Sequence, residues 1–143
     1  QSKGLDKFIK KQVRKNQPIL GICLGMQMLT KESNEGGYTE GLNLIPGKII
    51  ALDTPQWHIG WNTIEVKNDN PLFKESNGDY FYFNHSYTYE GPNKYQICKT
   101  ESGKDIIAAI GSSKIVGVQF HPEKSQSAGK KLLKNIINRL CDG

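Results

Sequence analysis

The sequence predicts an α/β fold with a mostly parallel central sheet, an antiparallel extension and helices on both faces. An apolar run at 18–22 leads directly into a helix-like segment, which is the strand–helix order of α/β proteins. Further strand-like runs then follow one another without helices between them. Such a succession favours antiparallel pairing at the edge of a parallel sheet.

The chain opens on an amphipathic pattern. Leu5, Phe8, Ile9 and Val13 recur at helical spacing, which predicts a helix over 4–15. Its polar side carries the basic residues Lys7, Lys10, Lys11, Arg14 and Lys15. The net charge is +5, but the basic residues are dispersed and no nucleic-acid-binding motif accompanies them. We interpret this side as a solvated helix face rather than a nucleic-acid surface.

The segment Pro18–Gln27 carries the most informative pattern. A short buried strand ends in Gly21-Ile22-Cys23-Leu24-Gly25, and a helix is expected from Leu24 to about Glu32. A Gly-x-Cys-x-Gly run between strand and helix is typical of a nucleophile elbow, whose strained turn lifts the nucleophile out of the sheet. The two glycines would remove side chains that collide with this turn. We expect the start of the helix to favour the thiolate of Cys23.

The middle of the chain is rich in short strand patterns separated by turn residues. The expected strands are Lys48–Leu52, Thr63–Lys67, Tyr80–His85, Lys94–Thr100, Ile106–Ile110 and Ile115–Phe120. The last strand delivers His121, followed by Pro122 and Glu123. Apolar residues at helical spacing from 128 to 140 then predict a closing helix, and we expect Ser125 or Ser127 to cap it.

Composition limits the class of protein. The 143 residues, 36% hydrophobic and 23% charged, fit one globular domain over residues 1–143. No apolar run approaches the ~20 residues of a membrane span. Three cysteines lack a disulfide spacing, so we expect a reducing, cytoplasmic setting. The histidines and cysteines have no metal-ligand spacing and no nucleotide motif is present, so we expect neither a metal nor another cofactor.

Cys23, His121 and Glu123 together can perform acyl transfer through a thioester. The histidine would take the thiol proton and return it to a leaving amine, while the carboxylate orients the imidazole. The backbone N–H of Leu24 would stabilise the oxyanion. Cys23 alone could be an inert buried cysteine, and His121 a structural histidine. Their positions at an elbow and at a strand end favour the catalytic interpretation.

The segments Gly21–Gln27 and His121–Glu123 resemble those of class I (triad) glutamine amidotransferases. The resemblance implies a flavodoxin-like domain that hydrolyses the side-chain amide of glutamine to glutamate and ammonia. It assigns the substrate-binding roles to Gln27, Glu35, Ser86 and Tyr87. The Glu35 carboxylate would bind the amino group of glutamine, a sensible match of charge.

Other segments resemble more narrowly the glutaminase subunits of imidazole glycerol phosphate synthases, from histidine biosynthesis. The resemblance spans almost the whole chain, through Gly41–Gly47, His58–Asn62, Tyr82–Tyr87 and Glu123–Gln126. It implies a heterodimer with a (β/α)8 cyclase subunit that receives ammonia through its barrel and makes imidazole glycerol phosphate and AICAR.

The same resemblance implies an interface formed by Trp61, Asn62, Tyr82 and Lys124, with the lysine paired to an acidic residue of the barrel. The alternatives are ordinary aromatic packing for Trp61 and Tyr82 and a solvated Lys124. His85 would be a structural or orienting group beside the substrate, and His58 has a weaker claim to a role.

The chain departs from the family pattern in two places. Family members carry earlier strand–helix units and a Gly-rich loop that completes the oxyanion hole, and we expect these to be missing here. A molecule that began at Gln1 would have a damaged sheet and poor activity. Gln56-Trp57-His58 also replaces the usual Pro-His approach to Gly60-Trp61-Asn62.

Three other functions stay open at this point. A paralogous glutaminase could feed a sugar amidotransferase in surface-polysaccharide biosynthesis, and the divergence at Gln56, Trp57 and Asn84 leaves room for it. The chain could also be a non-catalytic interaction module, although the complete triad argues against this. A stand-alone hydrolase of γ-glutamyl substrates would be highly active without a partner.

Overall fold

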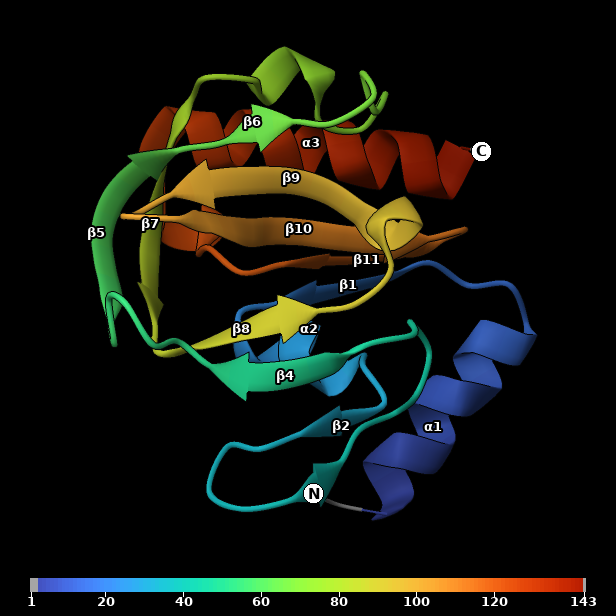
Figure 1. Ribbon diagram of the computed structural model, residues 1–143. Helices are drawn as coiled ribbons and strands as arrows, with labels where there is room; N and C mark the ends of the chain where they lie inside the picture. Colours follow the sequence, from blue (N-terminus) through green and yellow to red (C-terminus); the bar gives the residue numbers. More distant parts are fainter. Residues whose placement is uncertain (1–2, 143) are drawn as a thin grey trace.

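The computed structural model describes residues 3–142 of the expected domain and has an α/β architecture (Figure 1). Its α-helices are α1 (Lys3–Arg14), α2 (Leu24–Met28) and α3 (Gln126–Asp142). Its strands are β1 (Ile19–Ile22), β2 (Glu32–Ser33), β3 (Thr39–Glu40), β4 (Lys48–Ala51), β5 (His58–Thr63), β6 (Glu65–Val66), β7 (Tyr80–His85), β8 (Tyr87–Glu90), β9 (Gln96–Glu101), β10 (Asp105–Ser112) and β11 (Ile115–Val118). A short 3-10 helix, η3 (Pro122–Lys124), joins β11 to α3. None of the helices in this range is long and apolar enough to cross a membrane.

The main sheet has five strands in the order β1-β11-β10-β9-β6. β1 and β11 pair in parallel, with Ile22 opposite Val118, and the other neighbours pair antiparallel. The expected mixture of parallel and antiparallel pairing is therefore confirmed, but in the described residues antiparallel pairing predominates over the mostly parallel sheet that was expected. Because parallel neighbours end at the same edge, the residues that follow β1 and β11 meet there.

Helices cover both faces of this sheet. Val116 and Val118 of β11 belong to the same buried cluster as Leu132 and Ile136 of α3. On the other face, a Cβ added to Gly117 would lie 2.5 Å from the Cγ of Met26 in α2. Successive residues of a strand point to opposite faces, so α2 and α3 pack on opposite sides of β11.

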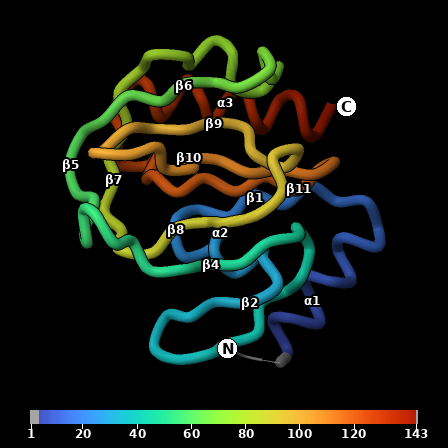
Figure 2. Tube along the Cα trace, in the orientation of Figure 1, coloured from blue at the N-terminus to red at the C-terminus, as the bar shows by residue number. Residues whose placement is uncertain are grey.

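Two smaller sheets complete the fold. β3-β2-β4-β8 form one of them, and the antiparallel pair β5–β7 forms the other. In Figures 1 and 2, β5 and β7 run across the end of the main sheet where β1 and β11 terminate. The backbone N–H of His121 donates to the carbonyl of Tyr82 at 2.9 Å, which joins β7 to the end of β11. This crossing brings the end of β7 beside the elbow.

The structure corrects several predicted boundaries. α2 ends at Met28 instead of near Glu32, because Glu32 pairs with Lys48 of β4 and so belongs to a strand. The strand expected at Thr63–Lys67 is divided between the end of β5 and β6. β8 was not expected. The tertiary pairing of β4 with β8 and of β5 with β7 decides these elements.

The predicted serine cap of the closing helix is wrong for Ser125. Its hydroxyl donates to the carbonyl of His121 at 2.6 Å and accepts from the N–H of Tyr82 at 3.0 Å. The alternative cap from Ser127 stays a prediction. Ser125 therefore ties together the two segments that meet at the end of the sheet.

Candidate active site

Cys23 occupies a strained turn between β1 and α2. Its φ of 52° and ψ of −106° are unusual for a residue other than glycine. A Cβ added to Gly21 would lie 2.6 Å from the carbonyl oxygen of Gly25, so the tight turn requires glycine at 21. Gly25 has open space instead, which corrects the expectation that both glycines relieve a collision. The nucleophile-elbow geometry that the sequence predicts is present.

Two groups from distant segments approach the thiol of Cys23. The side-chain amide of Gln119 donates toward Sγ at 3.8 Å, and Sγ lies 4.0 Å from the carbonyl oxygen of Asn84. Gln119 is fully buried, and its Oε1 has no hydrogen-bond partner in residues 3–142. No role was expected for Gln119, although it lies in the same run as His121. Its amide is aimed at the sulfur.

Burial raises the pKa of the Cys23 thiol, and this is the largest influence on it. The N–H of Leu24 and the amide of Gln119 act in the opposite direction, while the charges of Glu123 and Glu35 add to the increase. The N–H at the start of α2 therefore favours the thiolate, as expected, but burial of the sulfur outweighs it and the thiol pKa is raised. A resting thiol needs a base.

His121 and Glu123 form a hydrogen-bonded pair at the end of β11. The Nδ1 of His121 lies 2.8 Å from Oε2 of Glu123. A carboxylate only accepts, so Nδ1 carries the proton and Nε2 of the neutral ring is left to accept one. Among residues 3–142, no hydrogen bond joins His121 to Cys23. The parallel pairing of β1 and β11 nevertheless ends both strands at one edge.

A cavity of about 250 Å³ opens beside the nucleophile. Its lining residues are Cys23, Leu24, Gln27, Glu35, Trp57, Asn84, His85, Ser86 and Tyr87. All four residues expected to bind the substrate are among them. His121 and Glu123 are not, since they follow the neighbouring strand. The amide of Gln27 donates to the carbonyl of Tyr87 at 3.5 Å and links two sides of the cavity.

Trp57 and Asn84 were not expected to line this cavity. The indole N–H of Trp57 donates to Oδ1 of Asn84 at 2.9 Å. Both residues had been noted only as departures from the family pattern. Trp57 immediately precedes β5 and Asn84 lies in β7, so the pairing of these two strands brings the two departures together, and the sequence pattern does not show this contact.

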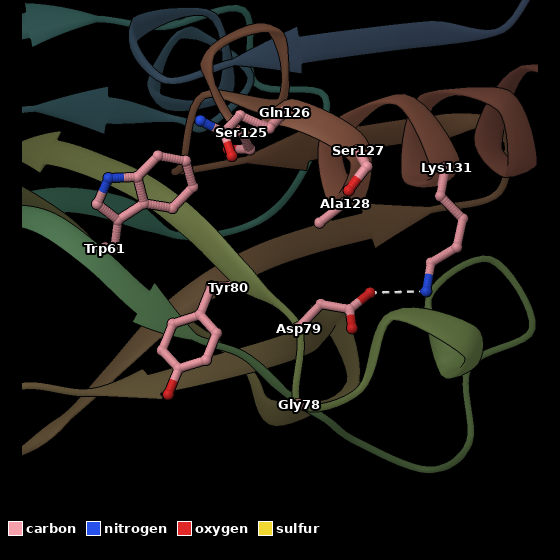
Figure 3. A pocket seen from close by; sticks show the side chains of 9 residues that line it. All are labelled: Trp61, Gly78, Asp79, Tyr80, Ser125, Gln126, Ser127, Ala128 and Lys131. Carbon is pink, nitrogen blue, oxygen red and sulfur yellow. Dashed lines mark ion pairs between the residues drawn. The ribbon is translucent and has the colours of Figure 1, made fainter.

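A second, larger groove of about 850 Å³ lies away from Cys23 (Figure 3). In Figure 3 the rings of Trp61 and Tyr80 stand on one side, facing the start of α3, and an ion pair of 2.7 Å joins Asp79 to Lys131. The lining of this groove includes serines and Lys131 but neither a cysteine nor a histidine that could serve as a base. We therefore place the chemistry at the smaller cavity around Cys23.

The four residues expected at a partner interface differ in their exposure and in their contacts. Trp61 is 49% exposed, and its ring lies 6.0 Å from that of Tyr82, which lies 6.4 Å from the His121 ring. Lys124 is exposed and has no ion-pair partner in the described part of the chain. Asn62 is half-buried and its amide donates to the carbonyl of Glu101 at 2.7 Å.

The groups in residues 3–142 include no cluster of three or more His, Cys, Asp or Glu that could hold a metal ion. The three cysteines are free: Cys98 is buried, Cys141 is exposed and Cys23 is intermediate. The arrangement at Cys23 is suited to acid–base and nucleophilic chemistry by side chains.

Comparison with known proteins gives a consistent family. The sequence model of the family "Glutamine amidotransferase class-I" matches residues 2–140. The chain is 45% identical over 137 residues to the imidazole glycerol phosphate synthase subunit HisH of Caldanaerobacter subterraneus, covering 93% of this chain and 68% of the relative. It is 42% identical over 138 residues to the subunit of the same name from Listeria monocytogenes, covering 94% of this chain and 66% of the relative. The chain thus spans about two thirds of the length of these relatives.

Solved structures share the fold at lower sequence identity. A glutamine amidotransferase from Thermotoga maritima has a TM-score of 0.71 and 21% identity, covering 99% of this chain and 70% of that one. PurLQS from the same organism has a TM-score of 0.73 and 21% identity, covering 95% and 68%. These similarities concern the fold alone.

Proposed function

The chain belongs to the class-I glutamine amidotransferase enzymes, and within them to the imidazole glycerol phosphate synthase subunits named HisH; from this premise we propose that its cavity hydrolyses the side-chain amide of glutamine. The products would be glutamate and ammonia. The observation that carries the proposal is the cavity of about 250 Å³ that places Cys23 beside Gln27, Glu35, Ser86 and Tyr87. Gln27, Glu35 and the adjacent pair Ser86 and Tyr87 come from three separate segments of the chain.

Glutamine binding would use both of the charged groups on its α-carbon. The Glu35 carboxylate matches the α-amino group of the substrate, and Ser86 and Tyr87 line the part of the cavity left for its α-carboxylate. Gln27, only 6% exposed and anchored on the Tyr87 carbonyl, would hold the substrate near the elbow. This orientation directs the side-chain amide toward Cys23.

The first half of the reaction forms a thioester. Sγ of Cys23 attacks the amide carbon while its proton passes to Nε2 of His121. Glu123, already bonded to Nδ1, stabilises the imidazolium that results. The negative oxygen of the tetrahedral intermediate accepts the N–H of Leu24. When the carbon–nitrogen bond breaks, His121 returns the proton to the departing nitrogen and ammonia is released.

The second half frees glutamate. A water molecule attacks the thioester carbonyl and gives one proton to His121. The carbon–sulfur bond then breaks, and His121 returns this proton to Sγ. Overall, one glutamine and one water become one glutamate and one ammonia. Because burial raises the pKa of the Cys23 thiol, the enzyme depends on His121 in both halves.

Within this proposal, the ammonia passes to a (β/α)8 cyclase subunit of imidazole glycerol phosphate synthase, the pathway being histidine biosynthesis. The names of the relatives describe subunits of such a synthase. The exposed Trp61, its neighbour Tyr82 and the unpaired Lys124 support a docking face on this side, since Tyr82 also packs near His121. We assign the ammonia exit to the same side.

The test is release of glutamate from glutamine by the protein alone and with the cyclase and its ribulosyl substrate. We expect weak activity alone and a stimulation of at least about tenfold in the complex, a usual size for coupling between sites. No stimulation, with Cys23 still alkylated by a reactive glutamine analogue, would move the acceptor to another pathway such as a sugar amidotransferase.

Replacement of the nucleophile separates the two activities of the complex. Cys23→Ala should abolish use of glutamine by at least about a thousandfold, because no covalent intermediate can form. The cyclase in the same complex should still use added ammonium. Retained hydrolysis of glutamine in this variant would refute the assignment of the nucleophile.

A further inference from the structure

Two buried histidines lie edge to face beside the substrate cavity, and the reaction described above uses neither. His58 begins β5, His85 ends β7, and the two are cross-strand partners. They are 5% and 4% exposed. His58 Nδ1 lies 2.9 Å from His85 Nε2. Such a short contact between two imidazoles requires one ring to donate and the other to accept.

The surroundings determine which ring donates. His85 Nδ1 lies 2.8 Å from the carbonyl oxygen of Tyr87, which can only accept, so Nδ1 carries the proton. Nε2 of neutral His85 must then accept, and Nδ1–H of His58 donates to it. Burial lowers the pKa of His85 to about 4 and also lowers the pKa of His58. Both rings are therefore neutral near pH 7, as this pattern requires.

The other end of the chain of hydrogen bonds is equally determined. Asn62 Nδ2 lies 2.7 Å from the carbonyl oxygen of Glu101, and its Oδ1 accepts the N–H of Thr63 at 2.8 Å. These two contacts fix which atom of the amide is nitrogen. Nδ2 can therefore donate to Nε2 of His58 at 3.2 Å. The bonds all run in one direction, from Asn62 through the two histidines to Tyr87.

This series of hydrogen bonds ends at residues 84–87, which form one wall of the substrate cavity. The Tyr87 carbonyl that accepts from His85 also accepts from Gln27, and Ser86 lies between His85 and Tyr87 in the cavity lining. On the other side of His85, the carbonyl oxygen of Asn84 lies 4.0 Å from Sγ of Cys23. A shift of His85 would therefore displace wall residues that face the substrate.

We propose that His58 and His85 are positioning residues, whose one-directional hydrogen bonds hold the 84–87 wall in the shape that binds glutamine. The inference rests on the proposed glutaminase function. It assigns to β5 a second role, because the strand that presents Trp61 outward also supports the cavity inward. Neither histidine touches the reacting atoms. Their effect should fall on substrate binding more than on the chemical step.

Substitutions at His58 can keep or remove the donor to His85. In His58→Asn the amide nitrogen takes the place of Nδ1, whereas His58→Leu has no polar atom. Loss of a buried hydrogen bond predicts a KM for glutamine about tenfold higher in His58→Leu, with kcat within about threefold of wild type. His58→Asn should restore KM to within about threefold. Thr100→Val is the matched control, since it removes a buried bond of 2.7 Å to the carbonyl of Thr63 on β5 but none of the bonds that run from Asn62 to Tyr87.

Equal KM values in wild type and His58→Leu, with only a lower Tm, would overturn the proposal and leave the pair a structural role. Equal impairment of His58→Leu and His58→Asn would also overturn it. If His58→Leu does not fold, the same comparison of an asparagine and a leucine variant is made at His85. His85→Asn keeps a donor toward Tyr87 and His85→Leu does not, so only the leucine variant should raise KM, by about tenfold.

Alkylation of Cys23 distinguishes this inference from the function on which it rests. In a Cys141→Ser background, a chloroketone analogue of glutamine should label His58→Leu about tenfold more slowly than wild type. Iodoacetamide, which needs no substrate wall, should label both at similar rates. Failure of glutamine to protect wild-type Cys23 from iodoacetamide would count against the proposed function. Protection of wild type with unchanged analogue labelling in His58→Leu would count against the inference alone.

Discussion

At the scale of single residues, the reactivity of Cys23 results from opposing influences on one thiol. Burial raises its pKa, and the amide of Gln119 counters that increase from 3.8 Å. Oε1 of Gln119 has no hydrogen-bond partner within residues 3–142, so the acceptor of this buried amide is unused there. We infer that its value lies in the donor that it directs at the sulfur.

Gln119→Met should therefore raise the pKa of the Cys23 thiol further. Methionine has a size similar to that of glutamine but cannot donate a hydrogen bond to the thiolate. The rate of iodoacetamide alkylation as a function of pH measures this in a Cys141→Ser background, where the remaining Cys98 is fully buried. Gln96→Met on β9 is the control. A pH profile that is unchanged in Gln119→Met would show that the amide does not act on the thiol.

His85 should make the stability of the protein depend on pH. Its pKa is lowered from 6.5 to about 4 in the folded state, so the unfolded chain binds the proton more readily between these values. The contribution of neutral His85 to the free energy of unfolding is present above pH 6.5 and is lost as the pH falls toward 4. By linkage, roughly 2 kcal/mol is lost between pH 7.5 and pH 5. Urea unfolding should show this extra loss in wild type relative to His85→Asn, and equal losses would contradict a neutral buried His85.

At the scale of elements, the strand–turn–helix unit around the elbow has one glycine that the geometry requires and one that it does not. A Cβ at position 21 meets backbone atoms of Gly25 and Met26 at 2.6 to 2.8 Å, whereas a Cβ at position 25 meets nothing within 4 Å. Backbone cannot rotate away as a side chain can. The β1–α2 connection must therefore open to accept a larger residue at 21.

Gly21→Ala should lower the free energy of unfolding by about 1–3 kcal/mol, the usual cost of overpacking, and displace the nucleophile. Gly25→Ala is the matched control and should raise stability by up to about 1 kcal/mol, because alanine is the better helix former. Chemical denaturation of both variants gives the comparison. Equal effects at the two positions would show that the close approach at Gly21 is not real.

At the scale of the whole molecule, two strands crossing the end of the sheet connect an outer face to the catalytic cavity. β5 and β7 present Trp61 and Tyr82 toward that face, while His58 and His85 at the other end of the pair support the cavity. Lys124 directly follows Glu123, the carboxylate of the proposed triad, in η3. A partner that contacts this face would thus touch segments that also hold the active site.

Lys124→Ala should weaken binding of the cyclase by about three- to tenfold, because an exposed lysine would lose an acidic partner across the interface. The effect should diminish as salt is added. Titration of the cyclase against stimulated glutamate release measures the affinity, and Lys130→Ala, exposed on α3, is the control. Equal affinities for the two variants would place the docking face elsewhere.

Much of the fold could be predicted because its signals are local. The helical spacing in α1 and α3 and the strand patterns of β4, β7, β9, β10 and β11 each depend on a few neighbouring residues. The elbow at Cys23 needs only the glycine spacing between a strand and a helix. Short elements were less predictable, since pairing with β4 turned Glu32 from a helical residue into a strand residue.

The sequence by itself determined the α/β class, the elbow and the candidate triad, because these depend on motifs and on near neighbours, and the family resemblance supplied the candidate substrate residues. Only the tertiary structure decided what surrounds them. It paired β5 with β7 and so brought His58 to His85 and Trp57 to Asn84. It also buried the sulfur of Cys23 and reversed the expected shift of its pKa. Burial and desolvation arise from residues far apart in the chain, and no local pattern records them.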